Sequence, residues 1–147
     1  MNINYKIIEP STSKEFDGYF FVRWQVLRKP WNQQFGTEKD ELEHSSIHAC
    51  AVSEENEIIG VGRLHKVDSN TAQIRYMAVL PKYKNKKIGF SIISFLELKA
   101  REQNLKKIIL HARQDSIGFY IKNGYIVKEK SHLLFGNIQH YLMEKSL

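Results

Sequence analysis

Cysteine and long apolar runs are scarce in this chain, and each scarcity excludes a class of protein. The 147 residues include a single cysteine, Cys50. One thiol excludes a disulfide framework, and a chain of this length can bury most of its apolar surface around one core without a structural metal. No apolar run approaches the ~20 residues that cross a bilayer, and no basic leader with a cleavage site precedes the fold. We therefore expect a cytoplasmic, reduced protein that does not bind membranes.

Acidic residues are scarce in the second part of the chain. Residues 1–60 hold six Lys or Arg against ten Asp or Glu, whereas residues 61–147 hold sixteen against six, and the net charge is +6. Four of the lysines fall within residues 82–87. Nucleic-acid binding usually spreads basic residues along a stripe with aromatic side chains for stacking. One dense basic turn instead favours a compact polyanion such as a nucleotide, with a solvated turn that binds nothing as the alternative.

Hydrophobic periodicity predicts a mixed α+β chain around one sheet. The segment 31–45 is mostly polar and long, which indicates a loop on the substrate side with some helical turns. The strands of residues 47–80 form an antiparallel meander in which Ile74, Tyr76 and Ala78 share one face. Strands are expected over 3–8, 47–52, 58–65, 72–80, 107–112, 125–130 and 138–144. A first helix is expected to start at one of the N-cap candidates 11–13 and to end at Lys29. Further helices are expected over 88 to about 103 and over 116–122.

The basic turn lies between a strand and a helix. This order places backbone N–H groups and the positive end of a helix dipole at one point, where phosphate can dock. Lys84, Lys86 and Lys87 add charge, and Gly89 lets the backbone approach a ligand closely. The turn lacks the Gly-Lys-Ser/Thr of a nucleoside triphosphatase loop, and one glycine is too few for a dinucleotide fingerprint.

Two segments on either side of this turn carry a family resemblance. Residues 76–81 (YMAVLP), followed by the turn and Ile88-Gly89, resemble motif A of the GNAT superfamily of acyl-CoA-dependent N-acyltransferases. Residues 119–125 (FYIKNGY) resemble the Phe-Tyr-x-x-x-Gly-Phe/Tyr segment of the same superfamily. With their spacing, the motifs cover roughly residues 47–145.

The resemblance implies a single N-acetyltransferase domain over residues 1–147, with a mostly antiparallel central sheet flanked by helices. It also implies acetyl-CoA as co-substrate, with the turn around its pyrophosphate and the preceding strand along pantetheine. Lys87 stands where the family usually has the first glycine of the turn, and a lysine can occupy that position if its φ is negative. Arg113 stands where many members have an asparagine. The implied cofactor-binding residues are Met77, Ala78, Val79, Lys84, Asn85, Lys86, Lys87, Ile88, Gly89, Phe90, Ser91 and Tyr120.

For catalysis the resemblance makes Tyr120 the general acid that protonates the departing CoA thiolate. Proton removal from an ammonium needs a base that titrates near neutral pH, and an imidazole fits. His111 is our candidate, with His65 and His140 as alternatives near the acceptor, because Gln73 stands where some members place a glutamate. Inward-facing arginines at 63 and 75 are candidates for binding an acceptor carboxylate. The acidic residues of 38–57 would face a cationic amine or simply lie in solvent.

The expected function is therefore transfer of an acetyl group from acetyl-CoA to a primary amine by direct attack. The alternative is a non-catalytic acyl-CoA sensor or interaction module, and nucleic-acid binding is a third, less favoured hypothesis. Polyamines, amino acids, aminoglycoside-like sugars and protein termini all stay open as acceptors, as does a homodimer. We expect no metal, since His44 and His48 lack the glutamate of a zinc helix.

Overall fold

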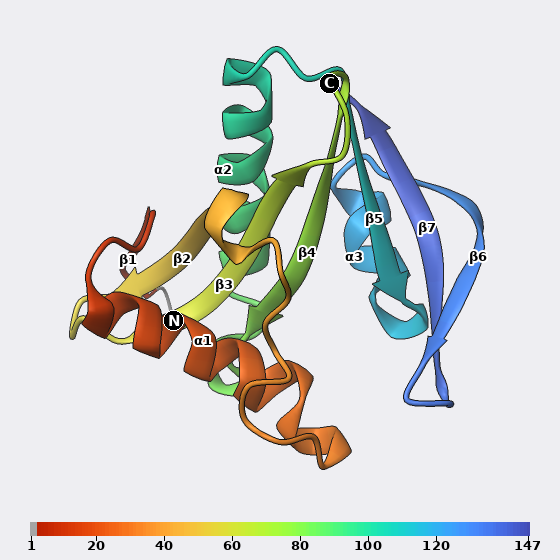
Figure 1. The fold of residues 1–147 in the computed structure, drawn as a ribbon. Helices are drawn as coiled ribbons and strands as arrows, with labels where there is room; N and C mark the ends of the chain where they lie inside the picture. Colours follow the sequence, from red (N-terminus) through yellow and green to blue (C-terminus); the bar gives the residue numbers. More distant parts are fainter. Residues whose placement is uncertain (1–2) are drawn as a thin grey trace.

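The computed structural model describes residues 3–147, and its elements follow the order that the sequence patterns predict (Figure 1). Its strands are β1 (Tyr5–Ile8), β2 (Ile47–Ser53), β3 (Ile58–Lys66), β4 (Thr71–Val79), β5 (Lys107–Arg113), β6 (Ile126–Leu134) and β7 (Ile138–Ser146). Its α-helices are α1 (Ser13–Leu27), α2 (Ile88–Glu102) and α3 (Ile117–Lys122). Short 3-10 turns lie at Lys29–Trp31, Glu43–Ser45, Pro81–Tyr83 and Gln114–Ser116.

The seven strands form one sheet in the order β1-β2-β3-β4-β5-β7-β6. Strands β1 to β4 are antiparallel neighbours, and so are β5, β7 and β6. Only β4 and β5 run parallel. The expected single domain with a mostly antiparallel sheet flanked by helices is thus confirmed, including the meander of β2, β3 and β4.

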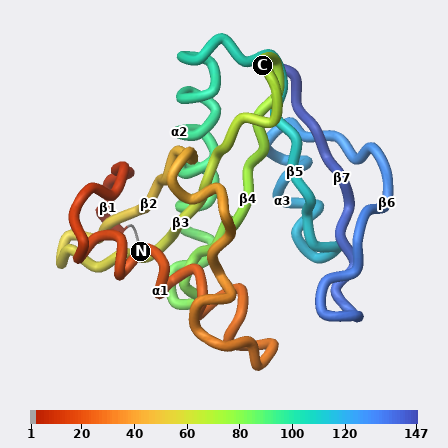
Figure 2. The backbone as a smooth tube through the Cα atoms, viewed as in Figure 1, coloured from red at the N-terminus to blue at the C-terminus, as the bar shows by residue number. Residues whose placement is uncertain are grey.

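The parallel pair is short, and this shapes the molecule. Strands β4 and β5 pair only at residues 71–73 with 107–109. Beyond Gln73 they separate, so that the sheet forms a V with its point near the C-terminus of the chain (Figures 1 and 2). Backbone groups of β4 that face β5 past this point therefore have no strand partner within residues 3–147.

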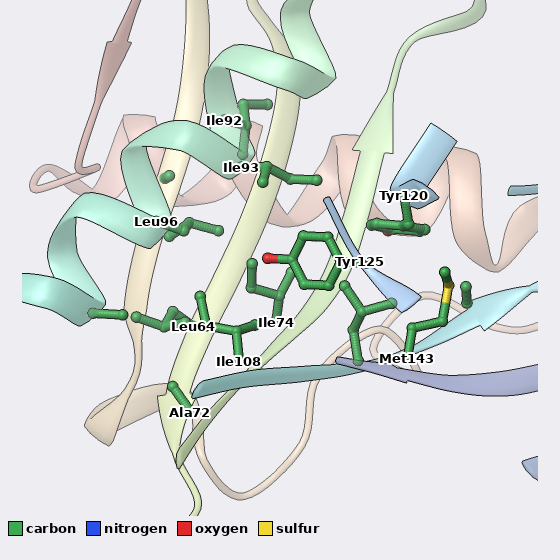
Figure 3. Close-up of a cluster of buried hydrophobic side chains, with 14 of the residues drawn as sticks. Leu64, Ala72, Ile74, Ile92, Ile93, Leu96, Ile108, Tyr120, Tyr125 and Met143 are labelled. Atoms are coloured by element: carbon green, nitrogen blue, oxygen red, sulfur yellow. The ribbon is translucent and has the colours of Figure 1, made fainter. Parts of the chain in front are cut away.

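Helices cover both faces of the sheet. Helices α2 and α3 pack on one face, and α1 with the loop that follows it packs on the other (Figure 1). Glycines let α2 approach β3 closely, because a Cβ at Gly60 would lie 2.9 Å from Ile88 and one at Gly62 2.8 Å from Ile92. The core on this side joins α2 and α3 through Leu96, Tyr120 and Tyr125 (Figure 3).

Helix α1 begins where a capping box fixes it. The Thr12 side chain accepts the Glu15 N–H at 3.1 Å, and the Glu15 carboxylate accepts the Thr12 N–H at 3.2 Å. This selects Thr12 from the three N-cap candidates.

Among residues 3–147, no helix is long and apolar enough to cross a membrane.

The predicted alternation along β4 is wrong at one point. A bulge interrupts the pairing of β3 and β4, where Val61 pairs with Ala78 but Arg63 pairs with Arg75. Tyr76 occupies it with φ 59°, a left-handed backbone that is unusual for a tyrosine. The extra residue moves Ala78 to the α1 side, whereas Ile74 stays on the α2 side.

Candidate active site

The separation of β4 and β5 opens a cavity of about 300 Å³. Its lining comes from both strands, the end of α1, helix α3 and the hairpin of β6 and β7. Residues predicted for catalysis, cofactor binding and acceptor binding meet here although they are far apart in the sequence. Those in the lining are Arg75, Met77, His111, Tyr120 and His140.

Tyr120 reaches this cavity from the core side. Its ring packs edge-on against Phe119 and Tyr125, with centroid distances of 5.0 and 6.0 Å. Figure 3 shows Tyr120 beside Tyr125 in the core. Burial raises the pKa of the phenol well above its usual range, and the positive charge of Arg113 opposes this rise only weakly. No hydrogen bond within residues 3–147 engages the hydroxyl. Tyr120 is thus protonated at neutral pH and free to donate a proton.

Three imidazoles line the same cavity. His111 lies on β5, His140 on β7, and His132 on β6 was not singled out from the sequence. The rings of His132 and His140 stack at 4.4 Å, and those of His111 and His132 lie 5.4 Å apart. A bulge between Lys130 and Leu133 interrupts the pairing of β6 with β7 and turns His132 toward the other two imidazoles. The alternation of side chains along a regular strand does not predict this orientation.

Burial keeps two of these imidazoles neutral. It lowers the pKa of His111, and the charge of His132 lowers it further. Burial also lowers the pKa of His140, although the hydrogen bond between its Nδ1 and the Ile138 carbonyl acts in the opposite direction. The Ser131 hydroxyl lies 3.0 Å from Nδ1 of His111. Both rings are therefore able to accept a proton near pH 7.

The structure places Arg63 inside the protein rather than in the cavity. Asp40 binds it in a fork, with Oδ1 2.6 Å from Nη1 and Oδ2 3.0 Å from Nη2, and Glu43 lies 2.9 Å from Nη1. The Nη2 atom also lies 3.2 Å from His65 Nδ1. These contacts occupy Arg63 and draw His65 toward it, so neither side chain has the geometry of a free acceptor contact.

The loop after α1 supplies the carboxylates. Glu43 also binds the buried Arg23 at 2.9 Å, and Asp40 reaches Arg75 at 2.9 Å. Sequence reasoning left this acidic segment either facing an amine or in solvent. Asp40 and Glu43 form ion pairs with arginines of α1, β3 and β4, and both also line a larger hollow beside α1.

The basic turn leads into a helix that no side chain caps. Lys87 is the N-cap of α2, and Ser91 is the first residue whose N–H finds a helical carbonyl, that of Lys87. The N–H groups of Ile88, Gly89 and Phe90 are left without an acceptor inside the helix. Helix α1 differs in that a capping box closes its start, whereas the short helix α3 also begins without a side-chain cap. The uncapped, lysine-flanked start of α2 suits an anion.

The backbone of the turn differs from the expected one at Lys87. Its φ is +63°, and Asn85 has φ +62°. Lys87 therefore does not meet the condition of a negative φ under which a lysine fits this position easily, and it takes the conformation for which glycine is favoured. A left-handed backbone costs a side-chain-bearing residue roughly 1–2 kcal/mol.

Two other residues of the turn have contacts within the protein. A Cβ at Gly89 would lie 3.0 Å from Cζ of Phe119, so this glycine makes room for an aromatic ring of α3. The Ser91 hydroxyl lies 2.7 Å from the Tyr5 hydroxyl and donates to the Lys87 carbonyl. Both contacts fix the start of α2 against its neighbours.

A larger hollow of about 620 Å³ lies beside α1, away from Tyr120 and His111. Its aromatic wall already holds a cation, since Lys39 Nζ lies 4.4 Å from the Phe20 ring centre. His48, at its edge, has partners at both nitrogens, Tyr19 and the Glu43 carbonyl. Within residues 3–147, no group of three or more metal-binding side chains is placed to hold an ion.

A sheet split between two parallel strands, with a basic uncapped helix beside the split, is the arrangement that the resemblance to acyl-CoA-dependent N-acyltransferases implies. Residues 11–125 match the acetyltransferase (GNAT) family. Because this match spans most of the chain, the protein belongs to the GNAT family.

Individual relatives agree with this assignment. A Bacillus subtilis protein named "Uncharacterized N-acetyltransferase YjcF" is 29% identical over 140 residues, which cover 95% of this chain and 99% of the relative. A solved aminoglycoside 6'-N-acetyltransferase in complex with coenzyme A superposes with a TM-score of 0.77 at 15% identity, covering 96% of both chains. A GNAT family acetyltransferase from Elizabethkingia anophelis with acetyl-CoA bound has a TM-score of 0.71 at 21% identity, covering 99% of both.

Proposed function

We propose that this protein transfers an acetyl group from acetyl-CoA to a primary amine by direct attack. The observation that carries the proposal is the cavity in the split sheet, which both Tyr120 and His111 line. A proton donor and a proton acceptor thus face one small space, as an acyl transfer from a thioester to an ammonium requires.

The residues present fit acetyl-CoA, whose thioester supplies the acetyl group. Its pyrophosphate would meet the free N–H groups of residues 88–90, with Lys84, Lys86 and Lys87 around it. Asn85 extends this backbone turn, and Phe90 and Ser91 continue it into α2. The unpaired edge of β4 past Gln73, formed by residues 77–79, would pair with pantetheine. Met77 lines the cavity itself, next to Tyr120.

The protons would move between two residues of the chain and the reactants. His111 would take the proton of the attacking amine at Nε2, because the Ser131 hydroxyl already contacts Nδ1. Tyr120 would give its phenolic proton to the leaving sulfur. Attack by the neutral amine on the thioester carbonyl and departure of a neutral thiol both lower the barrier. His140 would lie beside the acceptor.

The rival function is a non-catalytic acyl-CoA sensor. Two observations favour it: Lys87 holds a strained backbone in the phosphate turn, and the cavity lining includes no carboxylate that could act as base. Both hypotheses place acyl-CoA in the same split. They differ in whether an amine consumes the thioester.

Thiol release separates the two functions. The full chain is mixed with acetyl-CoA and a panel of amino acids, amino acid amides, polyamines, aminoglycosides and peptides, and free CoA is followed by a thiol reagent. The proposal predicts amine-dependent release with at least one class. Acetyl-CoA binding without release from any amine would support the sensor. The single catalytic domain over 1–147, the cytoplasmic location and the homodimer stay predictions.

A further inference from the structure

The buried and partly buried arginines of residues 3–147 fall into two kinds. Arg23 and Arg63 are fully buried, and both bind Glu43, with Asp40 as a second partner of Arg63. Carboxylates thus compensate the cost of removing these two charges from water.

Arg28, which is buried, and Arg113, which is partly buried, are the second kind. Arg28 is only 8% exposed, and it donates from Nε to the Thr37 carbonyl at 3.2 Å and from Nη1 to the Leu27 carbonyl at 3.1 Å. Arg113 reaches the same Leu27 carbonyl from Nη2 at 3.5 Å. Within residues 3–147, neither guanidinium forms an ion pair with a carboxylate.

Aromatic rings contact both guanidiniums without neutralising them. Arg28 lies 5.8 Å from the Tyr76 ring centre and 5.5 Å from that of Phe135, and Arg113 lies 6.0 Å from that of Trp31. No hydrogen bond among the described residues uses Nη2 of Arg28, or Nε and Nη1 of Arg113. Burial lowers the pKa of both side chains, whereas carboxylate partners raise that of Arg63 against the same effect of burial.

Both unneutralised guanidiniums line the cavity of the split sheet, together with Arg75 and the three imidazoles. No Asp or Glu is part of that lining. Arg75 is exposed and lies 2.9 Å from Asp40, a carboxylate that also binds Arg63. A polycation would therefore enter a positive space whose lining has no carboxylate. An anion would meet two forked donors that form no ion pair, although the charge of Asp115 acts on Arg113.

We propose that the acceptor is a small amine that carries a carboxylate, an amino acid, whose carboxylate binds Arg28 and Arg113 while its amine lies near His111. This inference rests on the proposed function and narrows it to one of the open acceptor classes. A forked guanidinium matches the two oxygens of a carboxylate, and a cavity of about 300 Å³ suits a small molecule.

A binding experiment tests the proposal without turnover. The full chain, saturated with CoA, is titrated calorimetrically with N-acetylglycine, N-acetyl-L-alanine and N-acetyl-L-glutamate, and with the matching uncharged C-terminal amides. We expect at least one acid to bind about tenfold more tightly than its amide, because the amide leaves both guanidiniums without an anion. Equal affinities for every acid and its amide would overturn the proposal.

Variants then locate the carboxylate. Arg113→Gln should weaken binding of the preferred acid about tenfold and leave binding of its amide unchanged. Arg113→Lys keeps the charge and should retain part of the preference. Arg101→Gln, which removes an exposed arginine of α2, is the matched control and should behave as the parent chain. Unchanged discrimination in Arg113→Gln, folded by circular dichroism, would overturn the assignment.

Turnover separates failure of this inference from failure of the proposed function. Thiol release with free amino acids should exceed that with their amides and with spermidine in kcat/KM by about tenfold. Preference for spermidine, for amides or for an aminophosphate would overturn the carboxylate assignment and leave the acetyltransferase intact. Absence of acetyl-CoA binding would instead overturn the proposed function.

Discussion

Asp40 and Arg63 form a forked ion pair that ties the loop after α1 to strand β3. Both oxygens of the carboxylate bind the guanidinium, at 2.6 and 3.0 Å, and the arginine is fully buried. Burial would raise the pKa of Asp40, but the hydrogen bond from Arg63, the Leu42 N–H and the arginine charges hold it well below its usual range. The loop that was expected on the substrate side is thus anchored electrostatically next to the cavity.

Removal of this carboxylate should destabilise the protein. Asp40→Asn leaves Arg63 buried with Glu43 as its remaining acid, and we expect the free energy of unfolding to fall by on the order of 3 kcal/mol. Urea unfolding measures this change. Glu41→Gln is the control, because Glu41 is exposed. Equal stability of the two variants would show that the ion pair does not hold the loop.

Tyr120→Phe tests the proton donor. The substitution keeps the ring packing against Tyr125 and removes only the hydroxyl, so kcat should fall about 100-fold while the Kd for acetyl-CoA stays unchanged. Tyr125→Phe is a matched control that removes a buried hydroxyl bonded to Glu97 at 2.9 Å, away from the reacting groups. It should lower stability and spare kcat. Similar losses of kcat in both variants would remove Tyr120 from the chemistry.

Acid should switch off the reaction through His111. Burial and His132 lower its pKa, so the ring is neutral at pH 7 and becomes protonated only below its ordinary pKa of about 6.5. We therefore expect kcat to be constant near pH 7 and to fall as the pH drops below 6.5. His111→Asn should reduce kcat and abolish this acidic limb. An identical limb in the variant would assign the proton transfer to another group.

Lys87 combines a favourable charge with an unfavourable backbone. Lys87→Asn removes the ammonium and keeps a residue that tolerates a left-handed backbone, whereas Lys87→Gly also removes the strain. Both variants should bind acetyl-CoA less tightly at low salt, with the difference shrinking at high salt. Lys87→Gly should be more stable than the parent by about 1 kcal/mol. Salt-independent affinity differences would argue against a phosphate contact.

Much of the fold was predictable because local patterns determine it. The alternating strands of the meander, the stripe of α1 with Thr12 before it, and the periodicity of α2 each require only neighbouring residues. The bulge at Tyr76 was not predictable, since no glycine marks its positive φ. Its consequence, Ala78 on the α1 side, was missed with it.

The candidate site was predictable only in part. Tyr120 and His111 follow from motif and strand position, and both line the cavity. The partners of the arginines depend on contacts between distant segments, so the sequence did not separate Arg63, which binds Asp40, from Arg28, which has no carboxylate. His132 was missed because a bulge in β6 directs it inward. The presence of three imidazoles on neighbouring strands was the available signal.

Calorimetric titration of the full chain with acetyl-CoA tests the central claim most directly. The uncapped start of α2, its lysines and the open edge of β4 predict one site per chain with a Kd between about 1 μM and 1 mM, the usual range for enzyme substrates. The same titration with adenosine 3',5'-diphosphate, which lacks pantetheine, should give weaker binding. Absence of binding heat at about 1 mM acetyl-CoA would contradict the account.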